Sequence, residues 1–255
     1  MNLIYKTGSS LILSVLIGAC FAQDGIGHYK EQPQALAAIT SYNPALSRVT
    51  KSHGIDAPSG QLADSLLDLK NKASSGDADA SAQLYAGLSA CKGMKGPPVS
   101  SNYSSQCKGI SEEDISEQGK WLDLAARLGD ERAQYAYAVG GFGAIVGSAQ
   151  NGLKNPELAS HYANTSRSYL DGLAKKCNVD AIAAIADDAG NGGLIYGNDP
   201  ERAYKFSLIK EMIQQDSSPP HYIAFTKYLE SKISPPSRLS VIREQASDFV
   251  NQYCR

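Results

Sequence analysis

The chain has 255 residues, enough for one long domain or for an array of small repeated units. Its 24 Lys and Arg residues nearly balance its 26 Asp and Glu residues, which gives a formal net charge of -2. This composition provides no basic field, so it argues against nucleic-acid binding. β-Branched residues never gather into alternating strands, and helices are therefore the expected secondary structure.

The first 19 residues have the layout of a signal peptide. Lys6 precedes an apolar run, Leu11–Ile17, that is too short to span a bilayer as a helix. The following Ile17-Gly18-Ala19-Cys20 resembles the lipobox of bacterial lipoproteins, in which the signal is cut before a cysteine that then carries lipid. The resemblance implies lipidation of Cys20, export to the periplasm and anchoring in the outer membrane. Cleavage after Ala22 and a retained anchor are the alternatives.

Residues 20–59 are rich in turn-forming residues and contain one apolar patch, "QALAAI" at 34–39. Segments with so few apolar positions cannot bury enough surface to form a core of their own. We therefore expect residues 20–59 to be a lipidated tether with one short helix.

Three segments of the chain align with one another without gaps. They are "GDADASAQLYAGL" from residue 76, "GDERAQYAYAV" from residue 129 and "CNVDAIAAIADDA" from residue 177. Counted from those residues, the fifth place is always alanine, and the ninth place is always large and apolar. Places four apart share one helical face, so each segment predicts a helix that a neighbour approaches closely at the alanine. The fifth and ninth places hold Ala80, Ala133 and Ala181, and Leu84, Tyr137 and Ile185.

Each copy follows a further helical segment, at 59–74, 111–128 and 155–176, and another helix is expected at 198–215. The copies begin 53 and 48 residues apart. Helix pairs at a nearly regular period predict an all-α fold and favour an α-solenoid over a non-repetitive helical bundle. Residues 92–110 and 140–154 are expected to be long loops. Two Pro-Pro breaks predict a capping helix pair over 216–255.

Residues in and before the second copy, and at the start of the helix expected at 198–215, resemble the Sel-one-like repeat family, which is related to the tetratricopeptide repeats. The matching residues are Gly129-Asp130 with Ala133-Gln134-Tyr135, Trp121 with Ala125-Ala126, and Asp199-Pro200 with Ala203. The resemblance implies a right-handed α-solenoid of about three to four antiparallel helix pairs over residues 60–215. It also implies that the first helix of each pair lines a concave binding face. The fourth, seventh, eighth and eleventh places are then open to a partner, and they hold Asp79, Gln83, Arg132, Tyr135, Asp180 and Asp187.

Four cysteines remain once Cys20 is assigned to lipid, and an exported domain favours their pairing. Cys91 lies near the end of one helix, and Cys107 lies just before the next. Cys177 begins a helix, and Cys254 ends the last one. Because successive helices alternate in direction, we expect Cys91–Cys107 and Cys177–Cys254 pairs. Crossed pairs would join opposite ends of helices roughly 20 Å long.

The sequence offers no clear catalytic or metal-binding motif. No C-x-x-C occurs, and the four histidines (His28, His53, His161 and His221) lie in no catalytic or metal spacing. "DDAGNGGLIYGND" at 187–199 lacks the alternation and closing Glu of a calcium loop. We interpret it as a turn between helices, with weak calcium binding as the alternative. No cofactor, metal or enzymatic activity is expected.

These observations predict a non-catalytic protein-binding module of the bacterial cell envelope whose partner is another protein. The family resemblance adds a narrower hypothesis, a periplasmic immunity protein that neutralises an antibacterial effector. A general envelope scaffold or adaptor, and a cell-wall or β-lactam hydrolase, are the alternatives. The hydrolase is disfavoured by the expectation that the chain lacks a Ser-x-x-Lys motif.

Overall fold

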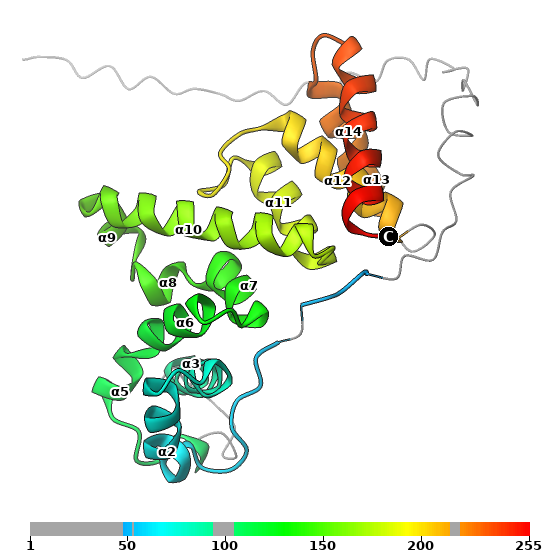
Figure 1. Ribbon diagram of the computed structural model, residues 1–255. Helices are drawn as coiled ribbons and strands as arrows, with labels where there is room; N and C mark the ends of the chain where they lie inside the picture. Colours follow the sequence, from blue (N-terminus) through cyan, green and yellow to red (C-terminus); the bar gives the residue numbers. More distant parts are fainter. Residues whose placement is uncertain (1–47, 53, 94–104, 215–219) are drawn as a thin grey trace, which may run out of the picture. The chain divides into compact units, whose positions relative to one another are not determined.

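The computed structural model describes residues 48–52, 54–93, 105–214 and 220–255 (Figure 1). All of them belong to one compact unit, Asn43–Arg255. The described residues form α-helices and two isolated β-bridges, so the expected all-α class is confirmed for this part of the chain. Within the same ranges, no helix is long and apolar enough to cross a membrane. The expected signal peptide, Cys20 and the short helix at 34–39 lie outside the described residues.

The helices lie close to the expected segments. In chain order they are α2 (Leu62–Ser74), α3 (Ala78–Gly93), α5 (Glu112–Ser116), α6 (Gln118–Arg127), α7 (Glu131–Gly140), α8 (Phe142–Ile145), α9 (Ala149–Lys154), α10 (Pro156–Lys175), α11 (Val179–Asn191), α12 (Pro200–Gln214), α13 (Pro220–Lys232) and α14 (Ser237–Tyr253).

The pairs α2–α3, α6–α7 and α10–α11 are joined by the same turn. Its first residue has a positive φ, +98° at Gly76, +94° at Gly129 and 55° at Cys177. The amide of the second residue donates over 3.1 Å to a carbonyl five residues earlier in all three turns. This is the hydrogen-bonding pattern of a Schellman ending, in which a left-handed residue satisfies the last carbonyls of a helix. The Gly-Asp step therefore ends one helix, and Cys177 takes the place of the glycine in the third copy.

The second residue of each turn also begins the next helix. The side chains of Asp77, Asp130 and Asn178 accept a hydrogen bond from the amide of the fifth-place alanine, at 3.0, 2.9 and 3.0 Å. Such N-caps satisfy one of the amides that an α-helix leaves without a partner. One dipeptide thus stops a helix and starts its neighbour in all three units.

The equivalent core places are buried in every unit. The fifth-place alanines are at most 3% exposed, and the ninth-place residues at most 1%. The preceding helix adds two further core places that were not expected from the sequence. They are a leucine seven places before the turn and an alanine three places before it. These residues are Leu69, Leu122 and Leu170, and Ala73, Ala126 and Ala174. Small residues at the closest approach let the paired helices pack tightly.

Two expected elements differ in the structure. Residues 111–128 form two helices, α5 and α6, because the chain turns at Glu117. Residues 140–154, expected to be a loop, contain the short helices α8 and α9. A Cβ at Gly119 would lie 2.1 Å from the carbonyl oxygen of Ala144, so α8 packs directly against the α6 backbone. The glycines of this region permit that close contact rather than a long loop.

The helices pack in chain order. α2, α3, α6, α7, α10, α11 and α12 each contact the next, and three clusters of buried residues lie between them. The expected terminal pair is arranged differently, since α13 and α14 both pack mainly on α12. An ion pair of 2.8 Å between Arg243 and Glu230 links these last two helices.

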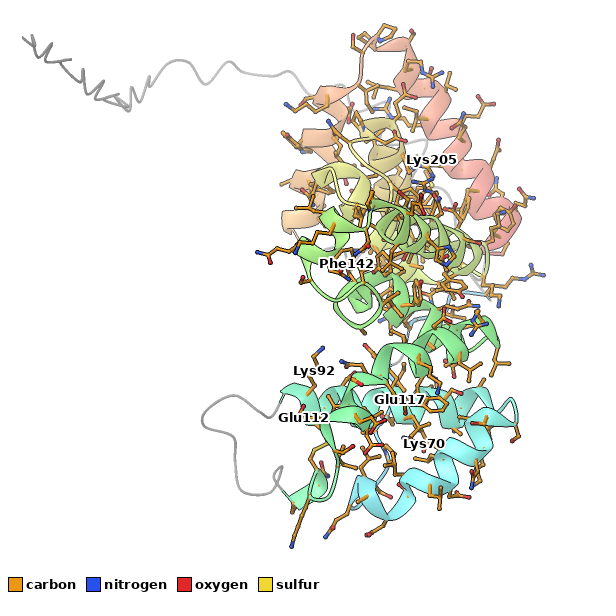
Figure 2. All side chains as sticks on the ribbon, turned by 90° about the vertical axis from the view of Figure 1, so that its left-hand side faces the viewer. Lys70, Lys92, Glu112, Glu117, Phe142 and Lys205 are labelled. Atoms are coloured by element: carbon orange, nitrogen blue, oxygen red, sulfur yellow. A yellow bond between two sulfur atoms is a disulfide. The ribbon has the colours of Figure 1, made fainter. Side chains whose placement is uncertain are left out.

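The first unit is further joined to α5 and α6 by Lys70. Its ammonium lies 2.7 Å from Asp114 and 2.9 Å from Glu117. Lys70 and Glu117 are labelled in Figure 2. The hydrogen bonds from Lys70 lower the pKa of both carboxyl groups, and Ser111 lowers that of Asp114 further.

Candidate functional site

The six residues expected to face a partner form two groups. Asp79, Gln83 and Arg132 meet on α3 and α7, whereas Tyr135, Asp180 and Asp187 line one cavity on α7 and α11. The two groups differ in how many hydrogen bonds and ion pairs their side chains already form within the chain.

The first group is a hydrogen-bonded network. The Arg132 guanidinium lies 2.6 Å from a carboxylate oxygen of Asp79 and 2.6 Å from one of Asp130. The Gln83 amide donates to the other Asp79 oxygen over 2.6 Å. The contact with Arg132 lowers the pKa of Asp79, and both carboxylates raise the pKa of Arg132. Arg132 and Asp79 therefore hold the first and second units together, and their charges are already paired.

The second group lines a cavity of about 350 Å³, which we call the α7–α11 cavity. Six of its lining positions are the fourth, seventh, eighth or eleventh places of the second and third copies. The cavity is lined by Tyr135, Ala138 and Val139 of α7, Leu170 of α10, Asp180, Ala183, Ala184, Asp187 and Asp188 of α11, and Ile195. Alanines at three of the lining positions leave the space open, because no longer side chain fills it.

The carboxylates of the α7–α11 cavity differ in their contacts. Asp188 accepts hydrogen bonds from the amides of Tyr196 and Ile195, at 2.7 and 3.4 Å, and so holds the following loop. Asp180 accepts one from the amide of Ser52, at 2.6 Å. Asp187 is exposed, and its charge acts on Tyr135 and Lys210 together with that of Asp180. The three carboxylates give the lining of the cavity a negative charge.

The neighbouring titratable groups respond to that charge. Burial raises the pKa of the Tyr135 hydroxyl, and Asp180 and Asp187 raise it further. Burial lowers the pKa of Lys210 on α12, against the attraction of the same two carboxylates. The Lys210 ammonium lies 3.1 Å from the ring centroid of Tyr222 and is not among the lining groups.

Part of the expected tether lies along these helices. The amide of Thr50 donates to the carbonyl of Cys177 over 3.1 Å, and Val179 donates to Thr50 over 2.9 Å. Further along, Ile55 packs beside the core cluster of α6 and α7, and Pro58 lies near Gly87 of α3. Residues 48–52 and 54–60, which we call the N-terminal strap, follow this course in Figure 1. The strap passes the α7–α11 cavity at Asp180.

Both disulfides of the structure are the expected ones. Cys91 is bonded to Cys107, with their Cα atoms 5.5 Å apart, and Cys177 to Cys254, with theirs 5.1 Å apart. The second bond ties the turn of the third unit to the C-terminal end of α14.

Residues 192–199 form the turn between α11 and α12, as expected, whereas residues 187–191 belong to the end of α11. Arg167 donates to the carbonyl of Ile195, and the Tyr196 hydroxyl donates to Asp171 over 2.8 Å. Asp199 caps α12 by accepting from the amide of Arg202, at 2.9 Å. Asp188 and Asp199 therefore have structural contacts in this segment. No group of three or more His, Cys, Asp or Glu residues among the described positions could hold a metal ion.

Three Ser-x-x-Lys spacings bear on the hydrolase alternative, because serine β-lactamases use this motif. They are Ser89–Lys92, Ser105–Lys108 and Ser207–Lys210, so the expectation that the chain lacks this spacing was wrong. The Ser89 hydroxyl donates to the side-chain oxygen of Gln118 over 2.9 Å. Ser207 is fully buried, and its hydroxyl has no hydrogen-bond partner in the described part of the chain. In this conformation its oxygen cannot meet a substrate. Ser105 is exposed and lies two residues before the bonded Cys107.

Comparison of the chain with family models, with curated proteins and with solved structures finds no match in any of the three.

Proposed function

We propose that this chain is a non-catalytic protein-binding module of the bacterial cell envelope, built as an α-solenoid of the Sel-one-like type. The observation that carries the proposal is the α7–α11 cavity, formed by equivalent places of two successive repeat units. Repeat proteins bind partners through side chains that recur on one face of stacked units. Tyr135 and Val139 contribute the aromatic and apolar surface typical of protein interfaces.

The repeat itself supports the solenoid. Three units share one turn, one N-cap and the same buried places, and the helices pack in chain order. In this arrangement each unit buries its apolar face against the next. We also propose that the solenoid is right-handed and that it consists of three to four helix pairs with a C-terminal cap.

The location rests on the cysteines and on the N-terminal sequence. Two disulfides suit an oxidising compartment outside the cytosol. Four of the five cysteines are paired in them, and Cys20 is the remaining one, within the segment that resembles a lipobox. We therefore propose a periplasmic protein held at the outer membrane by lipid on Cys20. Since a single acyl chain binds only marginally, the several chains of a bacterial lipoprotein would supply stable anchoring.

Within this class we favour an immunity protein that neutralises an antibacterial effector. An inhibitor needs a rigid surface that is ready to bind, and the disulfides and the Lys70 and Arg132 networks provide rigidity. A general envelope scaffold is the second candidate, supported by the same surface.

Affinity capture from an envelope extract tests the proposal. The full chain should retain a specific protein, and Ala183→Trp, which fills the α7–α11 cavity, should lose it. Gln150→Trp, on the exposed surface of α9, is the matched control and should retain it. An immunity role further requires that the captured protein arrests growth when it is expressed in the periplasm, and that co-expression of this chain restores growth. Equal capture by both tryptophan variants would contradict the proposed site.

A further inference from the structure

We propose that the α7–α11 cavity receives the side chain of a lysine or arginine residue of the partner protein. This inference rests on the proposed function and names the chemistry by which that function selects its partner. Three features of the cavity support it, namely its apolar walls, its charge and its size.

The walls suit the aliphatic stem of a long cationic side chain. Leu170 and Ile195 are buried behind the cavity, and Ala183 and Ala184 leave room on α11. Val139 is 53% exposed at the rim, so an entering stem would cover an apolar side chain that water now contacts. Lysine and arginine commonly bury their methylene groups against such surface while the charged group reaches polar partners.

The charge of the cavity favours a cation. Three aspartates line it, and none of the lining residues is a lysine or an arginine. Asp180 already accepts one hydrogen bond from Ser52, but a carboxylate has about four acceptor sites and can take further donors. Asp187 lies two helical turns further along α11, within the same lining. An ammonium or guanidinium group could therefore donate to a carboxylate and lie against the Tyr135 ring.

The cavity is large enough to admit a long side chain. Its volume of about 350 Å³ is near the lower limit of sites for small molecules, which commonly range over about 300–1,000 Å³. One lysine or arginine side chain is smaller than this volume. The exposed Val139 and Asp187 at the rim leave surface for the rest of the partner to contact.

Methyl NMR of the full chain with two matched probes tests the inference. The probes are N-acetyl-lysine methylamide and the uncharged N-acetyl-norleucine methylamide, which has the same stem without the ammonium group. The lysine probe should shift the methyl signals of Val139 and Ala183 and bind about tenfold more tightly than norleucine. Its affinity should fall as the salt concentration rises, because exposed carboxylates are screened.

Asp187→Asn should weaken the lysine probe by about tenfold and leave the norleucine probe unchanged. Asp180→Asn should act in the same direction while its amide oxygen still accepts from Ser52. Asp248→Asn, on the exposed surface of α14, is the control and should change neither. Equal affinity of the two probes, or no effect of Asp187→Asn, would overturn the inference. If the probe experiments fail but Ala183→Trp still loses the captured partner, the proposed function stands without this inference. If Ala183→Trp retains the captured partner, the inference and the proposed function both fail.

Discussion

Arg132 and Asp79, the fourth-place residues of two successive repeat copies, form an ion pair of 2.6 Å between α7 and α3. The same guanidinium contacts Asp130, which caps α7. These contacts bind neighbouring units together at a face that the family resemblance assigned to a partner. The structural role of Arg132 therefore has to be separated from any role in recognition.

Arg132→Met should destabilise the chain by about 0.5 kcal/mol, because Asp79 is largely exposed and surface ion pairs contribute little. Asp130→Ala should cost about 1–2 kcal/mol, because it removes the N-cap of α7 as well as an ion pair. Urea unfolding of both variants measures the difference. A larger loss from Arg132→Met than from Asp130→Ala would show that the cap is not the stronger contribution.

Glycine should be preferred over alanine at residue 177 once the disulfide is removed. Cys177 has a φ of 55°, and an L residue in the left-handed region costs about 1 kcal/mol relative to glycine. We compare Cys177→Gly with Cys254→Ala against Cys177→Ala with Cys254→Ala by chemical denaturation. The glycine variant should be the more stable, and equal stability would contradict the proposed equivalence of the three turns.

The fifth-place alanines should not tolerate larger side chains. Ala133 and Ala181 are fully buried, and Ala133→Leu or Ala181→Leu should cost about 1–3 kcal/mol through overpacking. Ala149→Leu, on an exposed position of α9, should stay within about 0.5 kcal/mol of the parent chain. Thermal unfolding compares the three variants. Tolerance at Ala133 equal to that at Ala149 would show that the paired helices are not closely packed there.

The ion pairs of Lys70 with Asp114 and Glu117, which we call the Lys70 cluster, should make the free energy of unfolding depend on pH in the acid range. The folded pKa values of Asp114 and Glu117 lie below their ordinary values, 3.8 and 4.5, so the unfolded chain takes up protons first as the pH falls. Their contribution is complete above about pH 5 and is lost as the pH falls through the ordinary range toward the lowered values.

Lys70→Met should therefore reduce the loss of stability between about pH 6 and about pH 3. Urea midpoints measured across this range test the expectation, with Lys154→Met on the exposed surface of α9 as the control. An unchanged pH profile in Lys70→Met would mean that the cluster does not couple protonation to folding.

The repeated turns were predictable because one dipeptide carries both the helix ending and the N-cap. Cys177 adopts the same turn although a residue other than glycine disfavours the left-handed backbone conformation. Its disulfide to Cys254 and its complete burial hold it there. The leucines and alanines before each turn also recur at equivalent places in the sequence, but they lie outside the three aligned segments. The glycine-rich segment 140–147 resembled a loop, and its helix α8 depends on packing against Gly119.

The candidate site was predictable only as a set of helical places. Whether a side chain at such a place is left for a partner or binds a neighbouring unit depends on its tertiary contacts. Arg132 pairs with Asp79 of the preceding unit, whereas Tyr135 lines the α7–α11 cavity. The contact of Thr50 with Cys177 and Val179 left no side-chain signal, because Thr50 is held through its backbone amide and carbonyl groups. Backbone contacts of this kind are nearly independent of the residue type.

Photocrosslinking in envelope vesicles tests the central claim, that a protein partner docks at the α7–α11 cavity, most directly. A photoreactive amino acid replaces Val139 at the rim, or Leu67 on α2, which is 73% exposed and serves as the distant control. The account predicts one protein adduct from residue 139, absent from residue 67 and lost when Ala183→Trp is added. An adduct from residue 67 alone, or an adduct from residue 139 that persists with Ala183→Trp, would contradict it.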